Sequence, residues 1–270
     1  MRLFNGKLHA TKIKNDIKQQ LSTLKLSKKL AIVIIGSDPA SFKYVQLKER
    51  LCQELSIPIE VCRLAGSMAD SELYNKVQKV FSDPDVGGGI IQLPLPRETL
   101  CDVLDTLPES KDIDLLSKPG LDKFYAGDLG RLSPVVRAFS YFLAENNFDL
   151  FGKRVTVIGY GELVGKPLEF FCKNLGAVTQ IVNDYHTSTQ IDTDFLILSS
   201  GVSNLVKGEN ISRGCSVVDF GYSVVNGKTV GDLDMKSRLD HLDAISPSPG
   251  GMGPLVVCFF VKNFLDTLNL

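Results

Sequence analysis

Hydrophobic positions in the first part of the chain follow two different spacings. Ile13, Ile17, Leu21 and Leu24 recur at intervals of three or four residues, which predicts a helix. Residues 30–35 instead form an unbroken apolar run rich in β-branched side chains, typical of a strand buried on both faces of a parallel sheet. Continuing the pattern predicts helices over 40–55 and 71–81 and strands over 59–64 and 89–93.

The second part of the chain carries another series of buried strands. The pattern predicts strands over 154–158, 178–182, 195–199 and 216–220, and helices over 135–146 and 255–268. This spacing predicts a Rossmann-type βαβ domain. Residues 108–130 are rich in Asp, Lys, Pro and Gly and show no clear period, so we expect them to connect two domains. The chain is therefore expected to be an α/β protein.

Composition excludes several classes of function. A chain of 270 residues with 44% hydrophobic side chains can form one large domain or two of roughly 120–150 residues. Its net charge of -1 does not indicate a nucleic-acid partner, and no apolar run is long enough for a membrane span. The first residues lack the apolar core of a signal peptide. Six scattered cysteines and three histidines show no metal-binding spacing, so we expect no metal site and reduced thiols in a cytoplasmic protein.

A glycine-rich turn follows the predicted strand at 154–158. Gly159, Gly161 and Gly165 give the spacing G-x-G-x-x-x-G, one residue longer than the commoner dinucleotide motif. Such a turn lets backbone N–H groups approach a pyrophosphate, and the helix dipole favours that anion. An ordinary glycine-rich turn between strand and helix is the alternative interpretation. Asp184 follows the next predicted strand, where an acidic residue often binds the ribose 2′-hydroxyl and favours NAD; the alternative is a solvated turn aspartate.

Candidate catalytic side chains gather in the first part of the chain. Ser41, Tyr44 and Lys48 share one face of the predicted helix, where a lysine next to a phenol can handle a proton. The alternative is a surface lysine beside a half-buried tyrosine. Gln92 ends a predicted parallel strand, the position where α/β sheets bind ligands, and two prolines stiffen the following backbone. Asp112 and Asp114 lie in the connecting segment, where a carboxylate can receive a pair of N–H donors from a planar heterocycle; turn chemistry is the alternative for both.

These segments resemble the bifunctional methylenetetrahydrofolate dehydrogenase/methenyltetrahydrofolate cyclohydrolase family over nearly the whole chain. The family's S-x-x-Y-x-x-x-K element resembles residues 41–48, and its Q-L-P-L-P element occurs unchanged at 92–96. Its K-D-V-D element resembles residues 111–114, and its P-G-G-V-G-P element resembles 249–254. The glycine turn keeps Val164, Gly165 and Pro167 of the family's cofactor turn.

The resemblance implies a folate domain over 1–120, a Rossmann dinucleotide-binding domain over 121–247, and a C-terminal segment over 248–270 that returns to the first domain. It implies a homodimer that oxidises 5,10-methylenetetrahydrofolate with a nicotinamide dinucleotide and hydrolyses the 5,10-methenyl product to 10-formyltetrahydrofolate. The implied catalytic residues are Lys48, Tyr44, Gln92 and Asp114. The implied substrate-binding residues are Ser41, Tyr44, Lys48, Gln92, Leu93, Pro94, Asp114, Gly251 and Pro254. The implied cofactor-binding residues are Gly159, Tyr160, Gly161, Val164, Gly165, Ser133, Asp184, Gly201 and Tyr222.

Two departures from the family pattern affect the expected choice of cofactor and the expected position of the loop that carries Asp114. Tyr160 and Gly161 stand where the family has the Arg and Ser that help hold the NADP 2′-phosphate, so both NAD and NADP stay open. Leu115 replaces the glycine that usually follows K-D-V-D, which predicts a different placement of the loop carrying Asp114. The alternatives to a bifunctional enzyme are a homologue that has lost one of the two activities and a non-catalytic folate- or nucleotide-binding protein.

Overall fold

The computed structural model describes residues 1–23 and 26–268, and its contacts divide the chain into two compact units. The three-stranded unit comprises Ile13–Pro134 and Val257–Leu270, and the six-stranded unit comprises Met1–Lys12 and Val135–Val256. These bounds differ from the domain bounds expected at 120 and 247. The first residues join the six-stranded unit because strand β1 (Arg2–Leu3) pairs with β13 (Ala244–Ser246). Leu24, the last position of the predicted helical spacing, lies outside the described residues.

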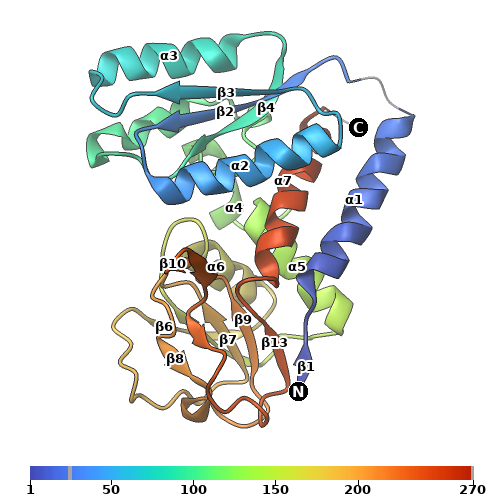
Figure 1. The fold of residues 1–270 in the computed structure, drawn as a ribbon, viewed down its shortest axis with the longest axis vertical. Helices are drawn as coiled ribbons and strands as arrows, with labels where there is room; N and C mark the ends of the chain where they lie inside the picture. The colour runs from blue at the N-terminus through green and yellow to red at the C-terminus, as the bar shows by residue number, and fades with distance from the viewer. Residues whose placement is uncertain (24–25, 269–270) are drawn as a thin grey trace. The chain divides into compact units, whose positions relative to one another are not determined.

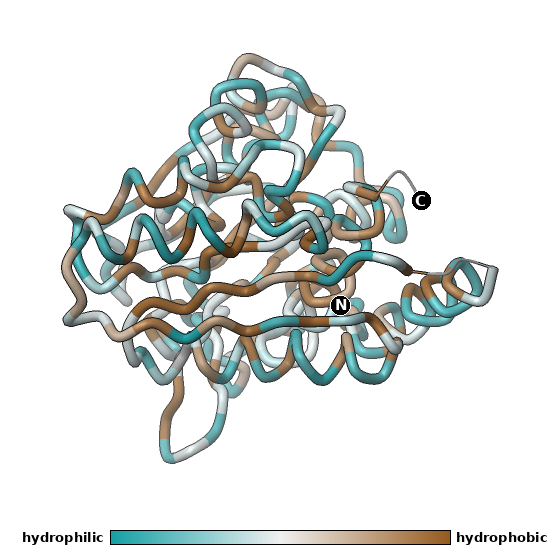
Figure 2. The backbone as a smooth tube through the Cα atoms, turned by 90° about the horizontal axis from the view of Figure 1, so that it is seen from above, coloured by the Kyte–Doolittle hydropathy of each residue, from teal (hydrophilic) through white to brown (hydrophobic). Residues whose placement is uncertain are grey.

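The sheet of the three-stranded unit is parallel, in the order β3-β2-β4. Its strands are β2 (Lys29–Ile35), β3 (Ile59–Leu64) and β4 (Val86–Gln92), as the apolar runs predicted to within a few residues. Every residue of the central strand β2 after the first is buried. Figure 2 shows such strands as long hydrophobic stretches, whereas the helices alternate in hydropathy. A two-sided core therefore explains why the run over 30–35 lacks polar alternation.

Helices α2 (Pro39–Glu54) and α3 (Asp70–Ser82) cover opposite faces of this sheet (Figure 1). The start of α2 is fixed locally, because Asp38 is its N-cap and accepts a hydrogen bond from the Ser41 N–H at 2.7 Å, and Pro39 opens the helix. Gly36, with φ of +97°, ends β2 just before this cap. The helix that carries Lys48 therefore begins immediately beyond the carboxyl end of a central strand.

The segment over 108–130, expected only as a connection, has regular structure of its own. It contains the 3₁₀ turn η2 (Glu109–Lys111) and the helix α4 (Lys118–Tyr125), and another 3₁₀ segment, η1 (Glu98–Thr106), precedes it. Asp112 fixes the start of α4, because this buried carboxylate accepts the Ser117 N–H at 2.8 Å. Such a contact leaves no periodic signal in the sequence.

The sheet of the six-stranded unit is parallel throughout, in the order β1-β13-β9-β7-β5-β6. Its further strands are β5 (Arg154–Ile158), β6 (Val178–Val182), β7 (Phe195–Leu198) and β9 (Ser216–Asp219). The chain passes from β5 outward to β6 and then to β7 on the other side of β5. That reversal is the topological switch point at which α/β sheets bind ligands, so the Rossmann-type prediction is confirmed.

The remaining elements complete both units. They are α1 (Gly6–Ser22), α5 (Pro134–Asn146), α6 (Gly165–Asn174), α7 (Met252–Thr267), β8 (Val206–Lys207), η3 (Gly208–Asn210), β10 (Ser223–Val225), β11 (Lys228–Val230) and β12 (Leu233–Asp234). The unit bounds at 12 and 256 fall within α1 and α7, so the last part of the C-terminal helix belongs to the three-stranded unit, as expected. No helix within 1–23 or 26–268 is long and apolar enough to span a bilayer.

Candidate active site

Lys48 lies inside the three-stranded unit rather than on its surface. The residue is only 5% exposed, and its ammonium group stands 4.6 Å from the centre of the Phe260 ring. A lysine is rarely buried to this degree unless it is paired. The interpretation of Lys48 as a surface lysine is therefore wrong, and its partners define the site.

Gln92 is a polar partner of Lys48. Its Oε1 accepts a hydrogen bond from the Lys48 Nζ at 3.2 Å, and its Nε2 donates to the Leu93 carbonyl at 2.8 Å. The second bond sets which end of the amide faces the lysine. Gln92 ends β4, next to the central strand that leads into α2, so two neighbouring parallel strands deliver this pair. The family resemblance implied that both are catalytic residues, and the structure brings them into contact.

Asp114 supplies a carboxylate to the same lysine. Its Oδ2 lies 3.9 Å from the Lys48 Nζ, and its side chain is 18% exposed. Leu115, which follows it, has φ of +54°, the left-handed region that favours glycine. The leucine therefore keeps the backbone conformation suited to the family's glycine, at a cost of about 1–2 kcal/mol. Because Leu115 adopts a conformation suited to glycine, the position of Asp114 can be explained without the predicted displacement of this loop.

Burial shifts the pKa values of this cluster in ways that favour proton exchange. Desolvation lowers the pKa of Lys48, and the Asp114 carboxylate opposes that shift. Desolvation raises the pKa of Asp114, and the Lys48 ammonium opposes it. Burial also raises the pKa of the nearby Cys52 thiol to about 12, which keeps it protonated at neutral pH. The Lys48 ammonium therefore gives up its proton at lower pH than an exposed lysine does, as a proton-exchanging group requires.

Two residues of α7 complete the cluster and were not predicted. Phe260 contacts the Lys48 ammonium through its ring face, and the Asn263 Nδ2 donates to the carbonyls of Ile113 at 2.9 Å and Leu132 at 2.8 Å. These bonds hold the backbone directly before Asp114. The sequence placed a helix here, but no local signal marked which of its residues would face the lysine.

Other residues of the predicted folate site have structural partners. Ser41 is buried, and its hydroxyl lies 2.8 Å from Asp38 Oδ2 and 3.1 Å from the Leu93 carbonyl, so it ties the start of α2 to the turn after β4. Tyr44 is partly buried one turn before Lys48 on α2, and the loop after β4 leaves Leu93 partly buried and Pro94 exposed. Their contacts with a substrate stay predictions.

The remaining charged residues of the K-D-V-D-like element are structural. Lys111 donates from its Nζ to the carbonyls of Phe81 at 2.7 Å and Asp83 at 3.1 Å, at the end of α3. Asp112 is 1% exposed and accepts the Ser117 N–H. Turn chemistry is therefore the right interpretation for Asp112, whereas Asp114 belongs to the lysine cluster.

In the six-stranded unit, two glycines of the turn after β5 are sterically required. Gly159 has φ of +89°, and a Cβ there would lie 2.6 Å from the Ser199 backbone. A Cβ on Gly165, the first residue of α6, would overlap the Gly159 carbonyl. A Cβ on Gly161 would meet no described atom within 4 Å. The turn is thus built by close backbone approach at its two ends, and the middle glycine leaves room for a ligand or a side chain.

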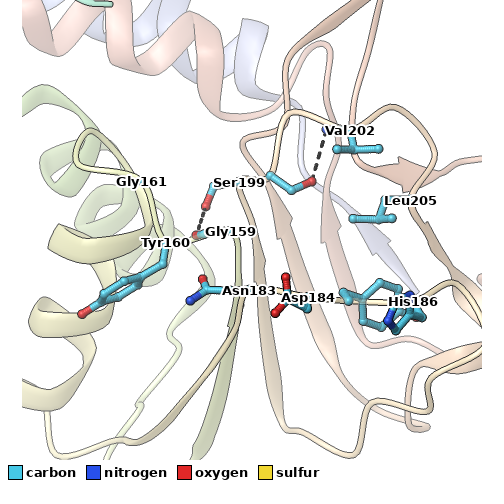
Figure 3. Close-up of a pocket in the computed structure, with 11 residues that line it drawn as sticks. Gly159, Tyr160, Gly161, Asn183, Asp184, His186, Ser199, Val202 and Leu205 are labelled. Carbon is cyan, nitrogen blue, oxygen red and sulfur yellow. Dashed lines mark hydrogen bonds between the residues drawn. The ribbon is translucent and has the colours of Figure 1, made fainter. Parts of the chain in front are cut away.

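A cavity of about 520 Å³ opens at this switch point. Its walls are the turns that follow β5, β6 and β7, and the lining residues are Gly159, Tyr160, Gly161, Asn183, Asp184, Tyr185, His186, Ser199, Ser200, Val202 and Leu205. Figure 3 shows the Asp184 carboxylate between Asn183 and His186, with Tyr160 on the side of α6. Ser199 joins two walls by donating to the Gly159 carbonyl at 2.7 Å. Four predicted cofactor residues therefore lie at one pocket.

The other predicted cofactor residues differ in position. Val164 is the N-cap of α6, and the Gly201 N–H donates to Asp232 Oδ2 at 3.2 Å. The residues that line the pocket do not include Val164, Gly165, Gly201 or Tyr222. Ser133 belongs to the three-stranded unit. Their contacts with a cofactor stay predictions.

Gly251 and Pro254, predicted to contact folate, belong to the six-stranded unit. Gly251 has a packing role, because a Cβ there would overlap Ser246 Oγ and a Cβ on Gly6 would overlap the Gly251 carbonyl. Pro254 lies in the first turn of α7, where a missing N–H costs nothing. Their roles in folate binding stay predictions.

A parallel sheet with a glycine turn at its switch point, together with a separate buried lysine cluster, defines a dinucleotide-dependent enzyme with a proton-handling lysine. Residues 4–114 match the family model described as tetrahydrofolate dehydrogenase/cyclohydrolase, catalytic domain, and residues 134–270 match its NAD(P)-binding domain. The chain belongs to the tetrahydrofolate dehydrogenase/cyclohydrolase family, and the resemblance found in the sequence is confirmed.

Individual relatives span the whole chain. The bifunctional protein FolD of Hydrogenobaculum sp. is 34% identical, and the match covers 98% of both chains. The crystal structure of the bifunctional methylenetetrahydrofolate dehydrogenase/cyclohydrolase from Campylobacter jejuni is 28% identical, covers 100% of this chain and 99% of that chain, and has a TM-score of 0.87. The Trypanosoma brucei enzyme, solved with NADP and an inhibitor, shares the fold at 23% identity, with a TM-score of 0.88 and coverage of 99% and 97%.

Proposed function

We propose that this chain oxidises 5,10-methylenetetrahydrofolate to 5,10-methenyltetrahydrofolate with a nicotinamide dinucleotide and hydrolyses the product to 10-formyltetrahydrofolate. The observation that carries the proposal is the buried Lys48, held between the Gln92 amide at 3.2 Å and the Asp114 carboxylate at 3.9 Å. A protein that only binds folate needs no buried lysine of lowered pKa. Family membership over both halves of the chain supports both activities.

The proposed chemistry gives each residue of the cluster one task. Water adds to the methenyl carbon, the bond from that carbon to N5 breaks, and one proton is released to solvent overall. Lys48 holds and passes the proton as the ring opens, and Gln92 sets how readily it does so. Tyr44 positions the folate ring, and Asp114 accepts N–H donors from the edge of the pterin. A nicotinamide dinucleotide held by the turn after β5 would supply the acceptor for the hydride that leaves the methylene carbon.

The turn after β5 fits a dinucleotide pyrophosphate. Gly159 and Gly165 leave no space for side chains, so the backbone itself forms the surface of the turn at the start of α6. The chain's contribution to hydride transfer is to bind and orient the cofactor in this pocket.

The Lys48→Met variant tests the cyclohydrolase assignment. Loss of methenyl hydrolysis by at least about a hundredfold is expected, because general acid–base catalysis contributes that much or more. Lys43→Met is the matched control, since Lys43 is exposed on the same helix. Thermal unfolding of both variants checks that they fold. Unchanged hydrolysis in a folded Lys48→Met protein would remove Lys48 from the mechanism.

Separate assays distinguish a bifunctional enzyme from one that has lost an activity. Methylenetetrahydrofolate with a dinucleotide reports the dehydrogenase, and methenyltetrahydrofolate without a dinucleotide reports the cyclohydrolase. Turnover in both assays is expected. Turnover in only one would assign the chain to a monofunctional branch, and binding without turnover in either would make it a folate-binding protein.

We propose NAD as the cofactor because of the charges of the residues that line the pocket. None of the eleven lining residues is a lysine or an arginine, and Asp184 adds a carboxylate. The nearby Lys166 is paired with Glu162. A 2′-phosphate would meet a carboxylate with no cation among the lining residues to offset it, whereas a 2′-hydroxyl can donate to Asp184.

The Asp184→Ser variant tests this preference. The ratio of kcat/KM with NADP to that with NAD is expected to rise about tenfold, which corresponds to roughly 1.4 kcal/mol. Asp192→Ser is a control in the same segment, because Asp192 pairs with Arg154 at an exposed site away from the pocket. An unchanged ratio for Asp184→Ser would show that this aspartate does not select the cofactor.

A homodimer is also proposed, and the edge of the six-stranded sheet supports it. β6 stands at one end of the strand order and exposes Val178 (64%) and Ile181 (37%). An exposed apolar edge strand invites pairing with another chain. Val178→Lys is expected to reduce the molar mass measured by light scattering, and Val224→Lys is the exposed control in the β10–β11 hairpin. A monomeric wild-type protein would refute the dimer.

A further inference from the structure

The segment that follows β7 forms one wall of the dinucleotide pocket. Residues 199–205 supply Ser199, Ser200, Val202 and Leu205 to the lining, and Figure 3 shows Val202 and Leu205 along this side. The segment is neither helix nor strand. Its conformation therefore depends on hydrogen bonds from other parts of the unit.

Asp232, just before β12, supplies bonds to the first residues of this wall. It is fully buried, and its Oδ2 accepts the Ser200 N–H at 2.6 Å, the Ser200 hydroxyl at 2.8 Å and the Gly201 N–H at 3.2 Å. Three donors from two consecutive residues converge on one carboxylate oxygen. Burial raises the pKa of Asp232, and the hydrogen bonds from Ser200 and Gly201 oppose that shift, so these donors and the carboxylate stabilise each other. The three bonds fix the direction of the chain as it leaves β7.

The backbone around Asp232 fastens the far end of the same wall. The Asn204 N–H donates to the Gly231 carbonyl and the Val206 N–H to the Asp232 carbonyl, each at 2.9 Å, as β8 pairs with β12. The wall is thus held at both ends by one short stretch of chain. A small displacement of that stretch would move the whole wall.

Asp219 in turn fixes this stretch to the central sheet. At the end of β9, its Oδ1 accepts the Asp232 N–H at 3.2 Å and its Oδ2 accepts the Leu233 N–H at 3.0 Å. Two glycines make the close packing possible: a Cβ on Gly231 would overlap Asp219 Oδ2, and a Cβ on Gly221 would overlap Asp232 Oδ1. The connection runs from a central strand through Asp219 to Asp232 and then to the wall.

The wall lies on the β7 side of the pocket, and Asp184 lies on the β6 side. If Asp184 meets the adenosine ribose, as acidic residues at this position do in dinucleotide folds, the β7 side takes the nicotinamide half. That half carries the reacting carbon.

We propose that Asp232 is a positioning residue for the dehydrogenase reaction, whose carboxylate fixes the wall at 199–205 that orients the nicotinamide half of the cofactor. The inference rests on the proposed function. It predicts an effect on one activity only, because the cyclohydrolase needs the Lys48 cluster and no dinucleotide.

Asp232→Asn keeps the size of the side chain and removes its charge. The dehydrogenase kcat/KM for the dinucleotide is expected to fall about ten- to hundredfold, as for loss of charge-assisted hydrogen bonds, while methenyl hydrolysis stays within about twofold of wild type. Asp234→Asn is the matched control on β12, because its Oδ1 accepts the local Lys236 N–H at 3.0 Å. It should retain both activities.

Ser200→Ala provides a second, milder test that keeps Asp232 intact. Its loss of dehydrogenase activity should be several-fold and should add only in part to that of Asp232→Asn in the double variant. Both variants weaken the bond between Ser200 and Asp232, and Ser200→Ala also removes the acceptor of the Val202 N–H at 3.2 Å. Additive losses would overturn the inference, as would wild-type dehydrogenase kinetics in Asp232→Asn. An equal fall of both activities with lowered thermal stability would also overturn it, because Asp232 would then only maintain the fold. A wild-type protein that turns over neither NAD nor NADP would refute the proposed function instead.

Discussion

Replacing Gln92 tests whether the amide controls the charge of Lys48. The Gln92 Oε1 accepts from the Lys48 Nζ at 3.2 Å and so stabilises the ammonium form. Gln92→Met fills a similar volume but offers no comparable acceptor. The pKa of Lys48, already lowered by burial, should fall further in this variant. Gln92→Glu places a carboxylate at the same position and should raise that pKa.

The size of the effect follows from the hydrogen bond that is lost. A bond to a charged group contributes about 1.5–3 kcal/mol, and about 1.4 kcal/mol corresponds to one pH unit, so the limb of the profile set by Lys48 should move by about 1–2 in pH. The direction does not depend on whether the acting lysine is neutral or charged. In both cases the limb moves to lower pH in Gln92→Met and to higher pH in Gln92→Glu.

The assay is the pH dependence of kcat/KM for methenyltetrahydrofolate hydrolysis across roughly pH 6–10, followed by absorbance. Gln46→Met is the control, because Gln46 is exposed on the same helix as Lys48. Thermal unfolding of each variant excludes a general loss of folding. The pH profile could stay in place in both Gln92 variants, or it could shift in the same direction in both. Either result would refute the view that this amide sets the protonation of Lys48.

Further predictions concern the glycine turn, the C-terminal helix and a buried carboxyl. Gly159→Ala should weaken dinucleotide binding at least about tenfold, whereas Gly161→Ala should bind within about twofold of wild type, measured by titration. Asn263→Ala should lower the free energy of unfolding in urea by about 1–3 kcal/mol, because two carbonyls lose their donor. Burial raises the pKa of Asp219 from 3.8 to about 7. Between pH 3.8 and about 7, the folded chain therefore keeps a proton on Asp219 that the unfolded chain has released. As the pH rises through this range, the free energy of unfolding should fall by up to about 1.4 kcal/mol per pH unit. Asp219→Asn should flatten this slope, measured by denaturation at several pH values.

Local sequence signals predicted most of the framework. The apolar runs fall on strands such as β5 (Arg154–Ile158) and β3 (Ile59–Leu64) with the same bounds, because strands buried on both faces need continuous hydrophobic residues. Polar residues inside motifs were harder to interpret. Ser41 and Asp112 both bond at helix starts, and a cap and a ligand-binding side chain require the same residue types.

Residue spacing was sufficient to place Gln92 and Gly159 at the carboxyl ends of strands and Lys48 on the helix that follows one, because parallel βα units bring those ends to one edge of each sheet. Long-range packing selected the rest. Asn263 bonds to a carbonyl 150 residues away, and Asp232 holds Ser200, 32 residues earlier in the chain. Neither contact has a period or a motif, since it depends on how separate elements meet after folding. The chain therefore encodes its reactive groups locally, whereas the side chains that hold them in position are specified by the packed core.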